Sequence, residues 1–262
     1  MVAPAGSGKT VTVGQWARRR PEVRWISAGE RERDVSGFAQ QLVAALGERP
    51  DGRPLAPSDL LDPGGDRLGE QFIDGLLGGL EETGRPLTLV IDDVDRLGPA
   101  VHADLRQLVA GAPPGVHLVG IARVDPDLGQ ARLRAYGDAV EIRIEQLRFG
   151  PDSTRDLVER VSSCRLDDTQ LATVMSLTEG WPIAVHLAGL ALRTAGDIGA
   201  RLGAFASSDR NVEDFLSEEV FKQLAEADRD LLVRTSVLPV LDGDLCDTVL
   251  RTVGSGARLD YL

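Results

Sequence analysis

Residues 3–10 read APAGSGKT, and this short stretch decides the fold class. It fits the phosphate-binding loop pattern G-x-x-x-x-G-K-[ST], except that Ala3 replaces the first glycine. Gly6 and Gly8 allow the chain to bend, so that backbone N–H groups converge on phosphate oxygens beside a helix N-terminus. Lys9 is then expected to reach the β- and γ-phosphates of a nucleotide, and the Thr10 hydroxyl to bind Mg²⁺. A glycine-rich turn that happens to contain Lys-Thr is the alternative.

Strand and helix patterns alternate after this loop. The runs VRWIS (23–27), LTLVID (87–92) and VHLVGIA (116–122) predict strands, the last two buried, and AVEIRIE (139–145) has the alternation of a further strand. Helical patterns lie between them. Strands that alternate with helices indicate a parallel sheet covered on both faces, so we expect an α/β domain. Helices are expected directly after the loop and over residues 35–46, 72–80, 99–110 and 128–135.

Two carboxylates follow the most apolar strand. Asp92 and Asp93 end LTLVIDD, which places them at the carboxyl edge of a parallel sheet, where ligands of such folds bind. Asp92 is the expected Mg²⁺ partner because this ion prefers oxygen ligands, and Asp93 could polarise an attacking water. The alternative is that the two acids only cap the next turn.

An arginine follows the neighbouring strand. Arg123 ends VHLVGIAR, and from a strand's carboxyl end it could reach a γ-phosphate and distinguish ATP from ADP. An ion pair with Asp125 or Asp127 is the structural alternative.

The pattern becomes purely helical after Gly150. Five helices and a short sixth are expected between Pro151 and Leu250, at 151–161, 167–180, 181–193, 211–224, 226–238 and 242–250. In GWP, Gly180 ends one helix and Pro182 begins the next, which by itself indicates only helix boundaries.

Composition excludes several classes of protein. The net charge of −12 argues against a nucleic-acid footprint, which needs clustered Lys and Arg. Two distant cysteines and three isolated histidines form no metal motif. No apolar run has the length of a membrane helix and no signal peptide begins the chain, so a cytoplasmic protein without a membrane partner is expected.

Four stretches in fixed order resemble the nucleotide-binding region of the large ATP-binding LuxR-type (MalT-like) regulators, members of the STAND class of signal-transduction ATPases. They are residues 3–27, LTLVIDDVDRL (87–97), GIARVDPDLGQARLRAYG (120–137) and TEGWPIAVHLAGLALR (178–193). The resemblance covers essentially the whole chain and implies ATP or ADP with Mg²⁺ as cofactors. It implies phosphate binding by Ala5, Gly6, Ser7, Gly8, Lys9, Thr10 and Val11, a metal site at Thr10 and Asp92, catalytic roles for Asp93 and Arg123, and packing of Pro182 near the adenine.

The resemblance also implies an organisation and a mechanism. A P-loop α/β domain (1–150) is expected before a small helical domain (151–208) and a partial winged helix (209–262). ADP would keep the protein closed and monomeric, ATP would favour self-association, and slow hydrolysis, if it occurs, would reset the switch. An inducer would act through regions outside this chain, and DNA through a C-terminal helix-turn-helix not present here. The sequence departs from the family at AGERERD, which leaves Glu30 without a role, and no Met-His-Asp triplet occurs before Leu262.

Only Met1 and Val2 precede the phosphate loop, although a buried strand normally enters it. We expect that strand to lie between the strand leading to Arg123 and residues 139–145, and to be largely missing. The chain would then be the interior piece of a longer regulator, with weakened nucleotide affinity. A P-loop ATPase with rapid turnover, such as an AAA-type remodelling enzyme, and an interaction module that no longer binds nucleotide are the alternative functions.

Overall fold

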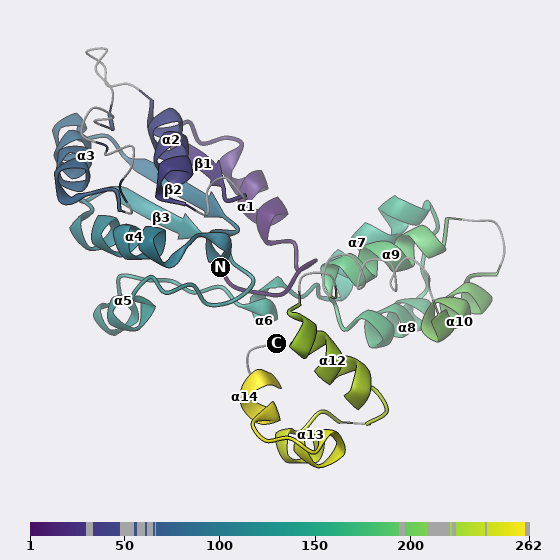
Figure 1. Ribbon diagram of the computed structural model, residues 1–262. Helices are drawn as coiled ribbons and strands as arrows, with labels where there is room; N and C mark the ends of the chain where they lie inside the picture. Colours follow the sequence, from purple (N-terminus) through teal and green to yellow (C-terminus); the bar gives the residue numbers. More distant parts are fainter. Residues whose placement is uncertain are drawn as a thin grey trace. The chain divides into compact units, whose positions relative to one another are not determined.

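A computed structural model describes residues 1–29, 34–47, 55–56, 61, 65, 67–193, 197–208, 221, 224–238 and 240–259. The chain divides into two compact units, Met1–Leu147 and Arg148–Leu262, and each is described by itself. The first unit (Figure 1) contains α1 (Lys9–Ala17), β1 (Val23–Ser27), α2 (Val35–Leu46), α3 (Glu70–Thr83), β2 (Leu87–Asp92), the 3-10 turn η3 (Val94–Arg96), α4 (Pro99–Gly111), β3 (Val116–Gly120), α5 (Gln130–Tyr136) and α6 (Ile144–Leu147).

The sheet of this unit is parallel, with the order β1-β2-β3. All six residues of β2 are buried, as the apolar run at 87–92 predicts for a central strand. β3 is only half-buried along most of its length, so the expectation of a second fully buried strand is wrong there. Burial becomes complete only past its end, at Ile121 and Ala122.

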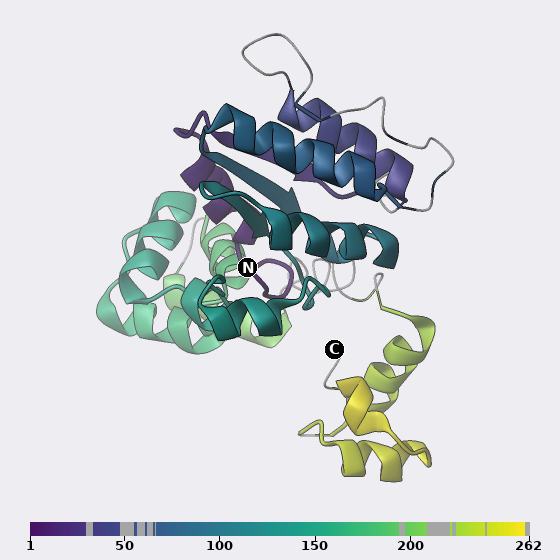
Figure 2. The same cartoon turned by 90° about the vertical axis from the view of Figure 1, so that its left-hand side faces the viewer.

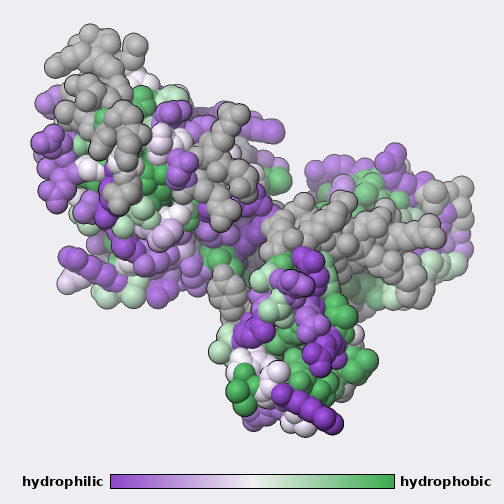
Figure 3. Space-filling model, in the orientation of Figure 1, coloured by the Kyte–Doolittle hydropathy of each residue, from purple (hydrophilic) through white to green (hydrophobic). Residues whose placement is uncertain are grey.

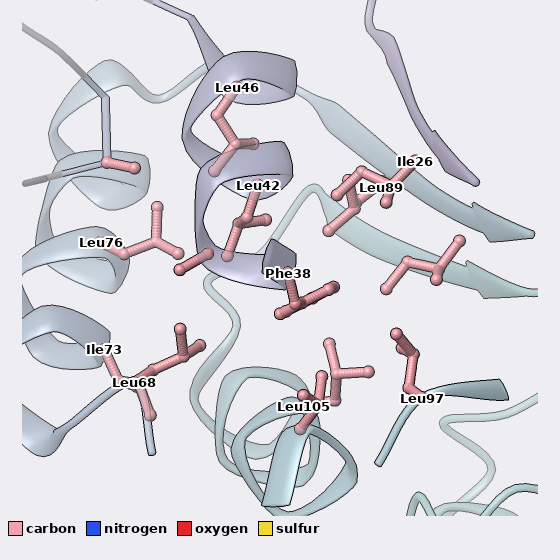
Figure 4. Close-up of a cluster of buried hydrophobic side chains, with 14 of the residues drawn as sticks. Ile26, Phe38, Leu42, Leu46, Leu68, Ile73, Leu76, Leu89, Leu97 and Leu105 are labelled. Carbon is pink, nitrogen blue, oxygen red and sulfur yellow. The ribbon is translucent and has the colours of Figure 1, made fainter. Parts of the chain in front are cut away.

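Alternation along the strands separates two apolar clusters. Leu87, Leu89 and Ile91 of β2 face the large cluster formed with α2, α3 and α4 (Figure 4), and Val90 points to the other face, where Val13 of α1 packs against it. Figures 1 and 2 show α2 and α3 together on one side of the sheet and α1 on the opposite side. The P-loop α/β fold with helices on both faces is therefore confirmed.

The expected strand at 139–145 is wrong. Residues 138–143 carry no strand, and residues 144–147 form α6. Alternation alone does not make a strand, because a strand also needs a ladder partner, and the segment beside it makes one bond to it, from the Val2 N–H to the Ile142 carbonyl (2.9 Å).

The second unit contains only helices in its described residues. Figure 1 shows α7 (Pro151–Ser162), α8 (Asp168–Thr178) and α9 (Pro182–Ala191) packed together, and these three helices share a core around Val158, Val174 and Val185. The remaining helices are α10 (Ile198–Ser208), α12 (Glu226–Thr235), α13 (Gly243–Leu250) and α14 (Ser255–Leu259). The sequence patterns did not predict α10 or α14, and the helix expected at 211–224 lies almost entirely outside the described residues.

Several apolar side chains are exposed in the second unit. Val237, Val240 and Val253 are exposed near α12, α13 and α14, where Figure 3 shows apolar residues among polar ones. Within the described residues, no helix is both long and apolar enough to cross a membrane.

Candidate nucleotide site

The phosphate loop connects a short extended segment to α1. The Ala122 N–H donates to the Met1 carbonyl (3.0 Å) and the Ala3 N–H to the Ala122 carbonyl (3.3 Å), so Val2 pairs with Ala122 in a parallel bridge. On its other side this segment binds Ile142. Residues 1–3 thus lie between the end of β3 and residue 142, the place expected for the strand that enters the loop.

The loop itself has the backbone that its glycines allow. Gly6 and Gly8 adopt left-handed conformations, with φ of 72° and 79°. Ala3 has no positive φ and is buried, which explains why alanine can replace the first glycine of the motif. α1 begins directly after Gly8, and the first turn of a helix leaves N–H groups without partners inside the helix. The geometry therefore fits an anionic phosphate group.

Lys9 lies in the loop and is 7% exposed. Its ammonium donates to the carbonyls of Ala3 (2.6 Å) and Pro4 (2.9 Å). Burial is the main cause that lowers the pKa of Lys9, and the Arg123 charge adds to it. A phosphate that reaches Lys9 would have to replace these carbonyl contacts, and it would favour the charged ammonium.

Thr10 and Asp92 meet across the sheet edge. The Thr10 hydroxyl donates to Asp92 Oδ1 at 3.2 Å. Asp92 has the same parity along β2 as Val90, so its side chain points to the face that α1 covers, and this brings the two oxygens together. Burial raises the pKa of Asp92 above its ordinary value. A divalent cation would favour the ionised form, and hydroxyl and carboxylate oxygens are ligands that Mg²⁺ prefers.

Asp93 does not continue β2. Its φ of 54° is in the left-handed region, and its Oδ2 lies 3.7 Å from Arg96 Nε, one turn further along the chain. The chain therefore changes direction at this residue. The half-buried carboxylate of Asp93 is one of the charges that raise the pKa of Lys9, which places it within electrostatic range of the loop.

Arg123 also belongs to this group, because its charge lowers the pKa of Lys9. The two carboxylates proposed as alternative partners bind other arginines. Asp125 binds Arg143 at 2.8 Å, and Asp127 binds Arg106 at 2.5 Å. The first unit therefore brings Lys9, Thr10, Asp92, Asp93 and Arg123 to one edge of the sheet.

Pro182 belongs to the second unit, where it begins α9. Local packing explains the GWP motif around Pro182. Gly180 has a φ of 71°, and a Cβ atom at this position would lie 2.3 Å from the Phe149 carbonyl oxygen. The Phe149 N–H donates to the Gly180 carbonyl at 2.8 Å. A close approach of two backbones thus requires this glycine, and sequence spacing alone could not show it.

Asp95 is a residue of this edge that the sequence patterns did not single out. Its Oδ1 accepts from the Arg123 N–H at 3.2 Å, and its charge acts on Lys9. The third acid in LVIDDVD was the available signal.

Two family models match parts of this chain. Residues 1–126 match the family model of the AAA domain, and residues 217–262 match that of the MalT winged helix domain. Among solved structures, the Aeropyrum pernix Orc1 protein in complex with DNA is similar with a TM-score of 0.49 and 19% identity, over 91% of this chain and 65% of that chain. A mutant of Thermotoga maritima RuvB has a TM-score of 0.49 and 14% identity, over 100% of this chain and 76% of that one.

The chain thus spans less than two thirds of the Orc1 chain. The two family matches describe a P-loop domain of the AAA type that precedes a winged helix of the MalT type. Together they make this chain similar, over these two stretches, to a MalT-like ATPase region.

Proposed function

We propose that the chain is the ATP/ADP switch of a LuxR-type transcriptional regulator, in which slow Mg²⁺-dependent hydrolysis controls self-association. The observation that carries the proposal is the convergence of Lys9, Thr10 and Asp92 at one sheet edge, where the Thr10 hydroxyl binds the Asp92 carboxylate. A buried lysine beside a positive-φ glycine loop suits the phosphates of a nucleotide, and the oxygen pair suits Mg²⁺.

Each residue has a role in this proposal. The backbone of Ala5–Val11 and Lys9 would bind the phosphates, and Thr10 and Asp92 would hold Mg²⁺, which would supply positive charge to neutralise the phosphates. Asp93 orients a water, and Arg123 recognises the γ-phosphate. Pro182 packs near the adenine and so ties the helical domain to the nucleotide.

The domain division belongs to the proposal as well. We place a nucleotide-binding domain at 1–150, a small helical domain at 151–208 and a partial winged helix at 209–262. Inducer and DNA would bind regions outside this chain, which is consistent with its net charge of −12. The location would be cytoplasmic.

A nucleotide can act as a switch only through a difference in affinity. ATP shifts the population toward an open, self-associating form if it binds that form better than the closed one. A shift from 1:99 to 99:1 needs about 10⁴-fold preference. Slow hydrolysis is compatible with this role, because the ATP-bound state must persist long enough to be read.

The test is calorimetric titration of the chain with ATP and ADP, with and without Mg²⁺. Lys9→Ala should abolish binding, and Arg19→Ala, which removes an exposed positive charge near the end of α1, should not. Equal heats from wild type and Lys9→Ala would refute nucleotide binding and support the interaction module. Turnover of many cycles per second would refute the switch and support a rapid ATPase.

A further inference from the structure

The ends of β2 and β3 remain connected beyond the sheet. The Ile121 N–H donates to the Ile91 carbonyl, and the Val94 N–H donates to the Ile121 carbonyl, both at 2.9 Å. The next donor on this edge, the Arg123 N–H, donates to the Asp95 carboxylate at 3.2 Å. A side chain therefore provides the last acceptor of this series.

The left-handed residue explains why a side chain is needed. Asp93, with φ of 54° and ψ of 39°, turns the chain out of β2 and into η3. In a 3-10 turn the carbonyls point along the turn axis and no longer across to the neighbouring strand. Asp95 restores the missing acceptor with its carboxylate.

The turn that carries Asp95 is fixed from a third element. The His102 ring nitrogen Nε2 of α4 lies 2.8 Å from the Val94 carbonyl, to which it donates, and Val94 itself is fully buried. η3 is thus held at its first residue, Val94. The Val94 N–H donates to Ile121, just after β3, and the Val94 carbonyl accepts from His102 of α4. The backbone of the turn that carries Asp95 is consequently held in place from two sides.

Asp95 and Arg123 also lie within electrostatic range of the phosphate loop. The Asp95 charge raises the pKa of Lys9 and the Arg123 charge lowers it, although burial remains the main cause of the lowered value. Arg123 therefore binds Asp95 through its backbone N–H, and the charge of its side chain acts at the loop.

We propose that Asp95 is a positioning residue, which fixes the Arg123 backbone through the Asp95 Oδ1···H–N bond and thereby sets how strongly the site prefers ATP to ADP. This role rests on the proposed function, because it assumes that Arg123 recognises the γ-phosphate. Asp95 itself need not touch the nucleotide.

Two variants separate the hydrogen bond from the charge. Asp95→Asn keeps an oxygen acceptor for the Arg123 N–H and loses the charge, and Asp95→Ala loses both. Asp127→Ala is the matched control, since Asp127 lies on the same segment after β3 but binds Arg106. Asp95→Ser, whose side chain is too short for this bond, replaces the alanine variant if that variant does not fold.

Two measurements are made on each variant: the ratio of ATP to ADP affinity by calorimetry with Mg²⁺, and hydrogen exchange at the Arg123 amide. Asp95→Ala should lower the affinity ratio by about tenfold and accelerate exchange at Arg123, with ADP affinity little changed. Asp95→Asn and Asp127→Ala should keep both values near wild type. In an Arg123→Ala background, Asp95→Ala should add nothing to the affinity ratio.

The outcomes separate this role from the proposed function. If the wild-type chain prefers ATP and Asp95→Ala keeps that preference, the role of Asp95 is refuted and the proposed function stands. Equal loss in Asp95→Asn and Asp95→Ala, with the Arg123 amide still protected, would also refute it, because charge would then be the cause. A wild-type chain that binds neither nucleotide, or both equally, would refute the proposed function and this role with it.

Discussion

Replacement of Gly180 by alanine should destabilise the helical bundle of α7, α8 and α9. Gly180 follows the end of α8 with a φ of 71°, and its missing Cβ leaves room for the backbone of Phe149. An added Cβ would lie 2.3 Å from the Phe149 oxygen and 3.1 Å from its nitrogen, both of which are main-chain atoms. No side-chain rotation can relieve this overlap.

The magnitude follows from two costs. An alanine in the left-handed region costs about 1–2 kcal/mol relative to glycine. Separation of the two backbones weakens the 2.8 Å bond from the Phe149 N–H to the Gly180 carbonyl, for a further cost of about 1 kcal/mol. We therefore expect a loss of roughly 2–3 kcal/mol before repacking, a large part of the stability of a small domain.

The assay is urea unfolding followed by tryptophan fluorescence. Trp181 is the single tryptophan in residues 148–262, so a chain in which Trp16 and Trp25 are replaced by phenylalanine reports on this unit alone. Gly203→Ala in α10 is the matched control, because a Cβ there meets no atom within 4 Å. In a helix interior this control should gain about 0.5–1 kcal/mol.

The comparison between the two alanines decides the matter. If Gly180→Ala unfolds at the same urea concentration as Gly203→Ala, or at a higher one than the parent chain, the close approach to Phe149 does not constrain residue 180. The explanation of the GWP motif as a packing requirement would then fail.

Two further changes test the first unit. Asp104 is fully buried in α4 and accepts hydrogen bonds from the Leu68 N–H (2.9 Å) and from Arg67. Asp104→Ala should therefore lower the free energy of unfolding in urea by about 2–4 kcal/mol, and Asp104→Asn should lower it clearly less. A change below about 0.5 kcal/mol for the alanine variant would contradict this. Asp92→Asn should raise the thermal midpoint near neutral pH while it lowers Mg²⁺-dependent ATP affinity at least about tenfold. Because burial raises the pKa of Asp92, the wild-type carboxyl is favourable to folding when protonated and costly once ionised, so the stability gained by asparagine should vanish below the ordinary pKa of 3.8; a gain independent of pH would refute this origin.

Local patterns predicted most of the first unit. The helix at 35–46 has the bounds expected from its apolar spacing, and Asp34 caps it through the Gly37 N–H. The buried run at 87–92 predicted β2 and, through strand alternation, the side of the sheet on which Asp92 lies. These features depend on neighbours in the sequence, which is why the sequence alone was sufficient.

Features that depend on distant contacts were not predictable in this way. The alternation at 139–145 resembled a strand, but its pairing depends on residues at the start of the chain, which make a single bond there. α10 was missed because its glycines at 199 and 203 lower the helix propensity of this segment. The Asp95–Arg123 bond joins residues far apart in sequence, and neither residue type indicates the other.

The two faces of the sheet have a consequence for how variants of this chain are judged. The large cluster beneath α2, α3 and α4 contains no residue of the loop 4–10, whereas the smaller cluster under α1 supports it. Most of the cohesion of the first unit is therefore separate from the residues that would handle a nucleotide. Mutations can therefore remove nucleotide binding by the loop, during evolution or in a laboratory library, while the yield and melting temperature of the protein stay high. A screen that selects only for soluble, folded protein would retain such chains, so each variant has to be assayed with nucleotide.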